Sequence, residues 1–215
     1  MANRVEAAVF DVDGTLLDSR EFIFQAYEHT LASYGRQIPN RRTIAREIGR
    51  SLPDCYRSFA PDGEIDKLCQ THHQFQAIHL DLIKPYRGLH LMLEQLSVRG
   101  IKLAAWSSRK GNLLPSLEMA GVRGYLQAVV QGDQVTRHKP DEEGLLKALD
   151  QLEVKPQNAA MLGDAVVDIE AGKRARVLLT VGITHGFGTK EDLIMASPTY
   201  IADSLFKIPD ILATD

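Results

Sequence analysis

The sequence predicts an α/β protein in which a parallel sheet lies between two layers of helices and an all-helical domain is inserted after the first strand. Strand and helix patterns alternate over residues 86–215, as is typical of βαβ units whose sheet is covered on both faces. Residues 17–85 show only helical periodicity. Because 215 residues suffice for one core and a smaller module, we expect a discontinuous core of residues 1–16 and 86–215 and a helical domain of residues 17–85.

The N-terminal part is predicted to contain one strand followed by four helical segments. An apolar run ending at Val9 is the strand, and Ser19 is a candidate N-cap for a helix that ends near Gly35. Further helices are expected over residues 41–48, from about Pro53 and from about Gly63. No strand pattern interrupts these segments, so the insertion is expected to be all-helical.

After Pro85 strands and helices alternate again. Strands are expected over residues 101–106, 127–130, 159–162 and 177–181. Helices are expected over residues 88–98, 111–120, 142–152, 166–174, 190–195 and 204–212. In open parallel sheets ligands bind beyond the carboxyl ends of the strands, so polar residues directly after these strands are the candidates for function.

The composition is that of an ordinary globular protein and argues against several partners. Hydrophobic residues make up 44% of the chain and the formal net charge is -3, which disfavours disorder and also nucleic acid or an anionic membrane as main partner. The apolar runs are strand-length and the N-terminus lacks the apolar segment of a signal peptide, so a cytoplasmic location is expected. Cys55 and Cys69 have no metal-binding or disulfide pattern around them, so we expect buried or half-buried thiols.

The segment FDVDGTLLDS, which starts at Phe10, places two carboxylates at the exit of the first strand. Side chains at i and i+2 of a strand point the same way, so Asp11 and Asp13 can face one site while Val12 turns into the core. Gly14 then allows the backbone to turn sharply. An ordinary Asp-Gly turn would explain one aspartate alone, but it does not explain the whole string.

Two further polar sites follow predicted strands in the middle of the chain. The strand ending at residue 106 leads into Ser107, Ser108 and Arg109, where a hydroxyl and the amides of a turn can hold a phosphate oxygen. A helix N-cap explains the serine pair about as well. Lys139 precedes Pro140, which favours extended backbone at the lysine and a directed side chain, although a solvated surface lysine is the alternative.

The last polar site is GDAVVD, in which Asp164 ends a predicted strand and Asp168 lies one helical turn further on. A hard cation such as Mg²⁺ prefers oxygen ligands and commonly takes one or two carboxylates together with substrate phosphate and water. Asp164 could join Asp11 in such a site. For either aspartate alone, an acidic helix start that complements the helix dipole is an adequate alternative.

Together and in this order, DxDGT, Ser-Ser after a strand, Lys-Pro and GDxxxD resemble the four motifs of the haloacid dehalogenase superfamily. The helical insertion behind the first motif and the segment PYRGLHLMLEQL resemble the cap region of the phosphoglycolate phosphatase and β-phosphoglucomutase branch. The resemblance implies a Rossmann-like core with an α-helical cap, a Mg²⁺ cofactor and a small phosphorylated substrate. The subunit state is left open between monomer and homodimer.

The resemblance also implies roles for individual residues. Asp11 would attack phosphorus and form an aspartyl-phosphate, and Asp13 would act as general acid and then as general base. Ser107 would bind the phosphoryl oxygens, and Lys139 would offset negative charge on nucleophile and phosphate. The remaining candidates for binding the substrate or its phosphate are Gly14, Thr15, Ser108, Arg109 and Arg50.

The resemblance implies a Mg²⁺ site formed by Asp11, the backbone carbonyl of Asp13 and Asp164, with Asp168 as a weaker ligand or as a group behind the ligands. Arg109 stands where relatives commonly have lysine, which points to altered contacts at the far end of the substrate. In the cap, the loop of residues 48–54 is the candidate for selecting the leaving group. There Gly49 permits a bend and the guanidinium fork of Arg50 could meet an anionic group. Solvated faces are expected for His72, His73, Arg41 and Arg42.

These inferences predict a Mg²⁺-dependent phosphatase that acts on a small phosphorylated metabolite such as phosphoglycolate. A phosphosugar mutase is the main alternative, because an aspartyl-phosphate can be passed to a sugar instead of to water. A pyrophosphatase is a further alternative, because pyrophosphate would also offer an anionic group to Arg50. Phosphonate hydrolysis requires a cap lysine that forms an imine. It is disfavoured because the lysines of the cap, Lys67 and Lys84, lie outside the loop of residues 48–54. A non-catalytic phosphate-binding protein is disfavoured because every expected catalytic position is occupied.

Overall fold

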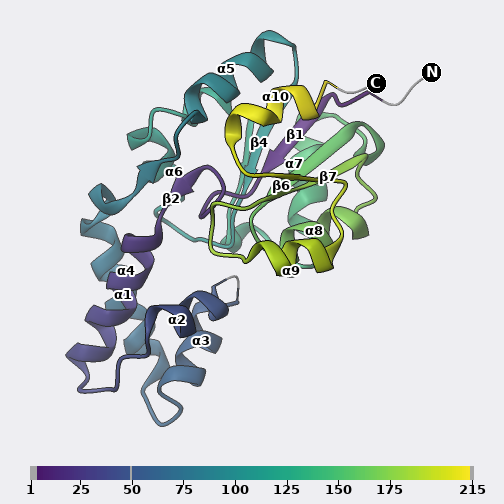
Figure 1. The fold of residues 1–215 in the computed structure, drawn as a ribbon. Coiled ribbons are helices and arrows are strands. Elements are labelled where there is room, and N and C mark those ends of the chain that lie inside the picture. The colour runs from purple at the N-terminus through teal and green to yellow at the C-terminus, as the bar shows by residue number, and fades with distance from the viewer. Residues whose placement is uncertain (1–3, 49, 214–215) are drawn as a thin grey trace.

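The computed structural model describes residues 4–48 and 50–213 and shows the predicted α/β core (Figure 1). Within these residues six strands form a parallel sheet in the order β5-β4-β1-β6-β7-β8. The strands are β1 (Ala7–Phe10), β4 (Lys102–Trp106), β5 (Ala128–Val130), β6 (Ala159–Gly163), β7 (Leu179–Ile183) and β8 (Tyr200–Ala202). In the pairing register Phe10 lies opposite Ala105 on β4 and Leu162 on β6. The residues after β1 therefore leave the sheet near its middle.

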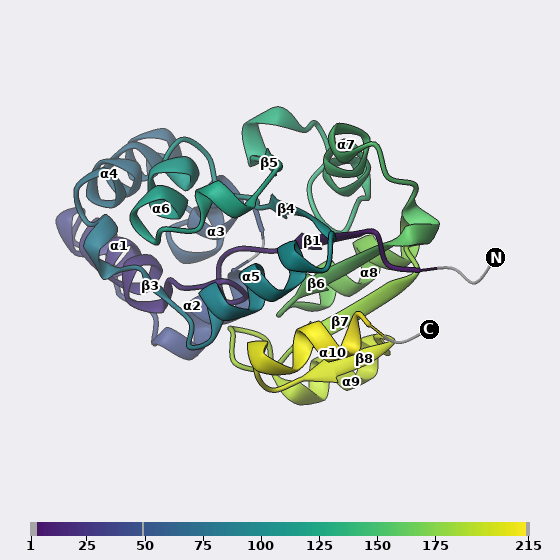
Figure 2. The ribbon, with the colours of Figure 1, turned by 90° about the horizontal axis from the view of Figure 1, so that it is seen from above.

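Helices cover both faces of this sheet (Figure 2). They are α5 (Leu89–Val98), α6 (Leu113–Met119), α7 (Glu143–Leu152), α8 (Val166–Arg174), α9 (Lys190–Ala196) and α10 (Ile208–Ile211). Ala8 and Phe10 pack in the same hydrophobic cluster as the buried residues of α5, α6 and α10. Ala7 and Val9 pack in the second cluster, with α7 and α8. Burial of every β1 residue explains why this strand reads as a continuous apolar run.

Four helices gather at one end of the molecule and form the insertion (Figure 1). They are α1 (Arg20–Ser33), α2 (Arg41–Glu47), α3 (Leu52–Phe59) and α4 (Ile65–Ile78). Their own hydrophobic cluster, called the cap cluster below, contains Phe24, Tyr27, Leu31, Ile44, Cys55, Tyr56, Ala60 and Leu68. Where the chain leaves and re-enters the core, β2 (Leu17–Asp18) pairs antiparallel with β3 (Lys84–Pro85). Both features support the division at residues 16/17 and 85/86, which stays a prediction.

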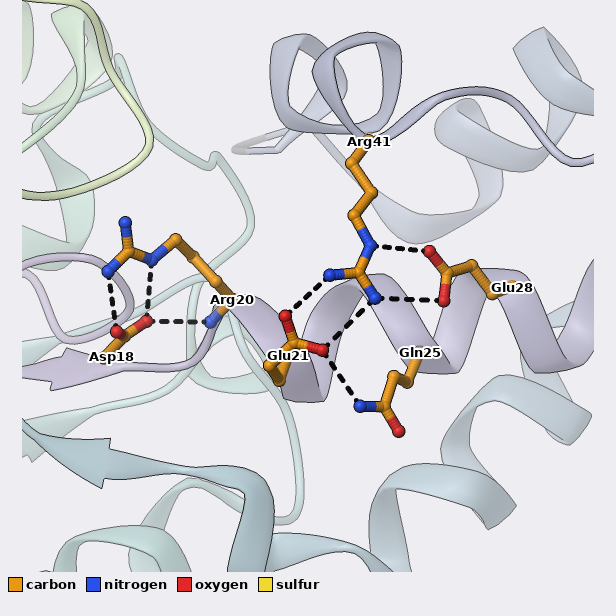
Figure 3. Close-up of polar contacts among 6 residues, drawn as sticks. All are labelled: Asp18, Arg20, Glu21, Gln25, Glu28 and Arg41. Carbon is orange, nitrogen blue, oxygen red and sulfur yellow. Dashed lines mark hydrogen bonds and ion pairs between the residues drawn. The ribbon is translucent and has the colours of Figure 1, made fainter.

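Ion pairs form at the start and on the surface of α1, the first helix of the cap (Figure 3). Arg41 of α2 binds Glu21 through Nη1 at 2.6 Å and Glu28 through Nε at 2.7 Å, so it links α2 to α1. At the start of α1, Arg20 pairs with Asp18 at 2.7 Å. Because the Arg41 side chain is 45% exposed, such pairs contribute at most about 1 kcal/mol each. The expected solvated position of Arg41 is thus correct, and its two partners are additional.

Several local predictions differ from the structure. His72 is buried, with Nδ1 2.8 Å from the Tyr56 hydroxyl, so the expectation of a solvated His72 is wrong, whereas His73 is exposed. Ser19 precedes α1 as expected, but its side chain makes no capping hydrogen bond. The strands β2 and β3 were not predicted, because two residues are too few to show an alternating pattern, and β8 was not predicted either. Gly49 lies outside the described residues.

Two expectations about the cysteines and about membrane segments can also be compared with the structure. Both thiols are free, with Cys55 buried and Cys69 partly exposed, in agreement with the prediction. Among the helices of residues 4–48 and 50–213, none combines the length and the apolar character that a membrane crossing requires.

Candidate active site

Three buried carboxylates from distant parts of the chain meet at the carboxyl end of the sheet. Asp11 directly follows β1, Asp164 directly follows β6, and Asp168 lies in the first turn of α8. One oxygen of each lies within 4.8 Å of one from each of the others. The parallel pairing of β1 with β6 accounts for this meeting, since both strands end at the same edge.

Lys139 is the cation in contact with this carboxylate cluster. Its Nζ lies 2.6 Å from Asp11 Oδ1 and 2.8 Å from Asp168 Oδ1, and it donates to the Trp106 carbonyl at 3.0 Å. Burial by itself would lower the pKa of Lys139, but the negative charges of Asp11 and Asp168 outweigh burial and raise it. Lys139 therefore stays protonated, and the alternative of a solvated surface lysine is wrong.

The cluster carries more negative charge than its cation can offset. Burial raises the pKa of Asp11 well above its usual range, with Lys139 opposing and Asp168 and Asp164 adding to the rise. Burial, followed by the charge of Asp168, raises the pKa of Asp164 to about 7. Both shifts have the cause expected where like charges share a water-poor site, and an added cation would reverse them.

The donor set fits a hard divalent cation. Carboxylate oxygens are the ligands that Mg²⁺ prefers, and one or two of them commonly suffice when substrate phosphate and water supply the others. Three carboxylates within reach of one point, with Lys139 beside two of them, leave room for added positive charge. Asp11, Asp164 and Asp168 are thus the described side chains that can hold Mg²⁺.

Asp13 is not part of that carboxylate cluster and pairs with Arg109. The guanidinium donates to Asp13 Oδ2 from Nε at 3.0 Å and to Oδ1 from Nη2 at 2.5 Å, which makes a two-pronged ion pair. A third nitrogen, Nη1, donates to Ser116 Oγ at 2.8 Å, and the guanidinium carbon lies 5.2 Å from the centre of the Phe22 ring. Ser107, which is buried, has its hydroxyl 3.5 Å from Asp13 Oδ2.

The other predicted phosphate-binding residues lie around the same turn. Gly14 has a φ of +92°, and a Cβ there would lie 2.4 Å from Asp164 Oδ2, so both conformation and space require glycine. Thr15 is buried and donates through its hydroxyl to Asp164 Oδ1 at 3.3 Å. Ser108 is half-buried, and its backbone carbonyl packs against Gly132.

Arg50 is placed apart from these groups. It is exposed and pairs with Glu47 at the end of α2. Among the described residues, no contact joins Arg50 to Asp11, Asp13 or Lys139. A role for Arg50 at the far end of the substrate stays a prediction.

Sequence reasoning missed the loop Thr184 to Gly188, which follows β7 and lies against Asp164. The backbone N–H of Phe187 donates to Asp164 Oδ2 at 2.6 Å. A Cβ on Gly186 would lie 2.1 Å from the same oxygen, and one on Gly188 would lie 2.1 Å from the Asp164 carbonyl oxygen. Two glycines around one aromatic residue, a few residues after the strand predicted over residues 177–181, were the available signal.

The parallel sheet thus carries three aspartates and a lysine together at its carboxyl end, as expected for an enzyme of the predicted superfamily, and comparison with known families agrees. The model for haloacid dehalogenase-like hydrolases matches residues 8–181, and the chain belongs to this family. This membership confirms the predicted family, the fold class and the enzyme class, that of a haloacid dehalogenase-like phosphatase.

Relatives match over nearly the whole chain. The pyrophosphatase PpaX of Listeria monocytogenes is 31% identical over 216 residues, which cover 99% of this chain and 97% of that protein. PpaX of Anoxybacillus flavithermus is 28% identical over 210 residues and covers 97% of each chain. A predicted phosphoglycolate phosphatase from Haemophilus somnus superimposes with a TM-score of 0.90 at 19% identity, covering 98% of this chain and 99% of that one, which shows a shared fold.

Proposed function

We propose that this enzyme is a Mg²⁺-dependent phosphatase that hydrolyses a small anionic phosphate compound through an aspartyl-phosphate on Asp11. The observation that carries the proposal is the contact of the buried Asp11 carboxylate with Lys139, beside Asp164 and Asp168. A carboxylate can attack an anionic phosphate only where positive charge screens it, and this is the place in the described chain where these groups meet.

The residues can divide two half-reactions between them. In the first, an Asp11 oxygen forms a bond to phosphorus while the bond from phosphorus to the leaving oxygen breaks, and Asp13 gives that oxygen its proton. In the second, water attacks the same phosphorus, Asp13 takes the proton from the water, and the Asp11 carboxylate is released. Throughout both half-reactions Lys139 offsets negative charge on Asp11 through its hydrogen bond. Ser107 is close enough to Asp13 to bind a phosphoryl oxygen beside it.

Asp11, Asp164 and Asp168 would hold the metal, with the Asp13 backbone carbonyl as a further ligand. When bound, Mg²⁺ supplies positive charge that neutralises the phosphoryl oxygens and lowers the barrier to attack by a carboxylate. Thr15 and the Phe187 N–H fix the Asp164 carboxylate through its two oxygens, so its direction is set before any ligand binds. The proton steps depend on Asp13 alone among these aspartates.

The ion pair between Arg109 and Asp13 supports a substrate with a second anionic group. Both Asp13 oxygens are engaged by Arg109, so Asp13 has to leave this pair before it can give a proton to the leaving oxygen. An anionic leaving end would compete for the guanidinium and release Asp13. Inorganic pyrophosphate has such an end, and the full-length relatives named pyrophosphatase PpaX support it as the first candidate. A phosphoglycolate-like monoester, which carries a carboxylate, also meets this requirement.

The test is a substrate panel with and without Mg²⁺. Phosphate release is measured from pyrophosphate, phosphoglycolate and p-nitrophenyl phosphate, whose far end is uncharged. We expect Mg²⁺-dependent turnover that EDTA stops, with the highest kcat/KM for pyrophosphate or phosphoglycolate. Absence of phosphate release from every compound would refute the proposal. In a separate assay on a sugar phosphate, transfer of the phosphate between sugar positions that needs a bisphosphate activator would favour the mutase.

The substitution R109M tests the basis of substrate choice. Loss of a charge-assisted pair is worth roughly 1.5–3 kcal/mol, so the ratio of kcat/KM for pyrophosphate to that for p-nitrophenyl phosphate is expected to fall about 10- to 100-fold. The matched variant R109K keeps the charge but loses the planar fork, so its ratio is expected to lie between those of the wild type and R109M. An unchanged ratio in R109M would contradict the role of Arg109 in recognising an anionic end.

A further inference from the structure

We propose that Phe187 is a positioning residue that couples the cap helix α1 to the Asp164 carboxylate, so that the arrangement of the cap and metal binding at Asp164 influence each other. The proposal rests on the proposed Mg²⁺ site but goes beyond it, because it concerns a loop that supplies no ligand and no catalytic group. It is carried by the contacts that the loop Thr184 to Gly188 makes on both sides.

On the core side, the loop determines where the Asp164 carboxylate points. Oδ1 accepts from the Thr15 hydroxyl at 3.3 Å, and Oδ2 accepts from the Phe187 N–H at 2.6 Å. The second bond is much the shorter and comes from backbone. A displacement of the Phe187 backbone would therefore remove the closer of the two donors and free Asp164 to turn.

The two glycines leave Phe187 as the anchor in its part of the loop. A Cβ on Gly186 or on Gly188 would lie 2.1 Å from an Asp164 oxygen, so neither position has space for a side chain. Residues without side chains allow close approach to Asp164, but they cannot hold the backbone in place. The position of the Phe187 N–H consequently depends on what its own ring packs against and on the contacts of His185 on the other side of Gly186.

That ring packs against the cap and against the turn after β1. It makes an edge-to-face contact with Phe24 of α1, with ring centres 6.1 Å apart, and it packs against the cap cluster. A Cβ on Gly14 would lie 2.8 Å from Phe187 Cδ2, so the ring also covers the turn after Asp13. One residue thus holds Asp164 through its backbone and the cap through its side chain.

His185 adds a second connection, to the two core segments that flank the cap in the sequence. Its Nε2 lies 3.1 Å from the Thr15 carbonyl oxygen, and its ring lies against that of Tyr86 in a tilted contact with 3.9 Å between ring centres. The Tyr86 hydroxyl donates to the His185 carbonyl at 3.2 Å. Since Tyr86 directly follows β3, the loop contacts the chain near the point where it returns from the cap and, through Phe187, also contacts α1.

These contacts couple the position of α1 to the affinity for metal at Asp164, and the coupling acts in both directions. If a shift of α1 moves the Phe187 ring, the N–H on Asp164 moves with it, and the affinity for the metal changes. By linkage, metal held at Asp164 then favours the cap arrangement in which Phe24 and Phe187 are in contact. A substitution on the cap side that never touches Asp164 should therefore weaken metal binding.

The experiment measures Mg²⁺ binding without substrate. Trp106 is the single tryptophan, is buried and has Lys139 Nζ 4.7 Å from its ring centre, so its fluorescence can report a change at the carboxylates during titration with MgCl₂. The Mg²⁺-dependent rise of the unfolding midpoint is measured in parallel. The variants are F187A, the conservative F187L, the cap-side F24A, and the control F59A, which removes an edge-to-face contact with Tyr27 beside the same cap cluster.

We expect F187A to raise the Mg²⁺ dissociation constant roughly 5- to 100-fold and F187L to recover part of this loss. F24A should raise it at least about 3-fold, and F59A should leave it within about 2-fold of the wild type. The proposal is overturned if F24A binds Mg²⁺ like the wild type, or if F59A weakens binding as much as F24A. Should F187A not fold, F24A and F187L decide.

The proposed function can fail separately. Normal Mg²⁺ binding without hydrolysis of any phosphate compound would remove the proposed reaction and leave the coupling standing. Absence of Mg²⁺ binding to the wild type by both readouts would overturn the coupling.

Discussion

The buried imidazole of His72 makes the stability of the protein depend on pH in a way that can be calculated. His72 lies on α4, is 3% exposed, and has its Nδ1 2.8 Å from the Tyr56 hydroxyl and its ring 4.7 Å from that of Tyr27. Burial, with a smaller contribution from His73, lowers the pKa of His72 to about 3. In the unfolded chain the same group titrates near about 6.5.

The sign and size of the effect follow from this difference. Because the pKa of His72 is lower in the folded state, its contribution to stability is fully present above about pH 6.5 and is lost as the pH falls toward 3. Each pH unit within this window changes the free energy of unfolding by about 1.4 kcal/mol. Between pH 7.5 and pH 5.0 the loss from this one residue is therefore about 2 kcal/mol.

The assay is urea unfolding at pH 7.5 and pH 5.0 in EDTA, so that metal binding does not contribute. H72N cannot titrate, and the stability difference between wild type and H72N is expected to shrink by about 2 kcal/mol at the lower pH. The control Y56F loses the hydroxyl but keeps the imidazole, so its pH dependence should resemble that of the wild type. A wild-type to H72N difference that stays constant to within about 0.5 kcal/mol would refute the reasoning.

Two other substitutions test the active site. D11N is expected to lower phosphate release at least about 1,000-fold, because an amide is not a nucleophile. The control D150N, on the exposed side of α7, is expected to keep wild-type turnover. Appreciable turnover by D11N would mean that Asp11 is not the nucleophile. G186A forces a Cβ to within 2.1 Å of Asp164 Oδ2 and is expected to reduce the free energy of unfolding by about 1–3 kcal/mol. G124A, at a position with open space, should change it by less than about 0.5 kcal/mol, and equal effects of the two alanines would contradict the steric argument.

Most of the core and the cap could be predicted because their elements are long enough to show a period. The helix expected to start near Ser19 is α1, and the strand expected over residues 101–106 is β4 within one residue. The strands β2 and β3 were missed because two residues carry no periodic signal. His72 was misplaced because its burial depends on Tyr27 and Tyr56, which belong to other helices.

In the candidate site, too, positions along the chain were predictable from the sequence and contacts between distant residues were not. The position of Asp11, Lys139 and Asp164 after or near strands predicted that they would meet, because the strands of a parallel sheet end at one edge. The direction of each side chain was not predictable in this way. Asp13 turns to Arg109, and Phe187 reaches both Asp164 and the cap, through contacts between residues far apart in the sequence.

The sequence by itself determined the kind of protein this is: the order of strands and helices, the inserted helical segment and the chemical groups at the strand ends. These properties depend on local periodicity and on residue type, which are read along the chain. Only the tertiary structure decided which groups touch, how far Asp11 and Lys139 are buried, and that a glycine-flanked phenylalanine joins Asp164 to α1. Burial and contact depend on packing between distant segments, and packing exists only once the chain has folded.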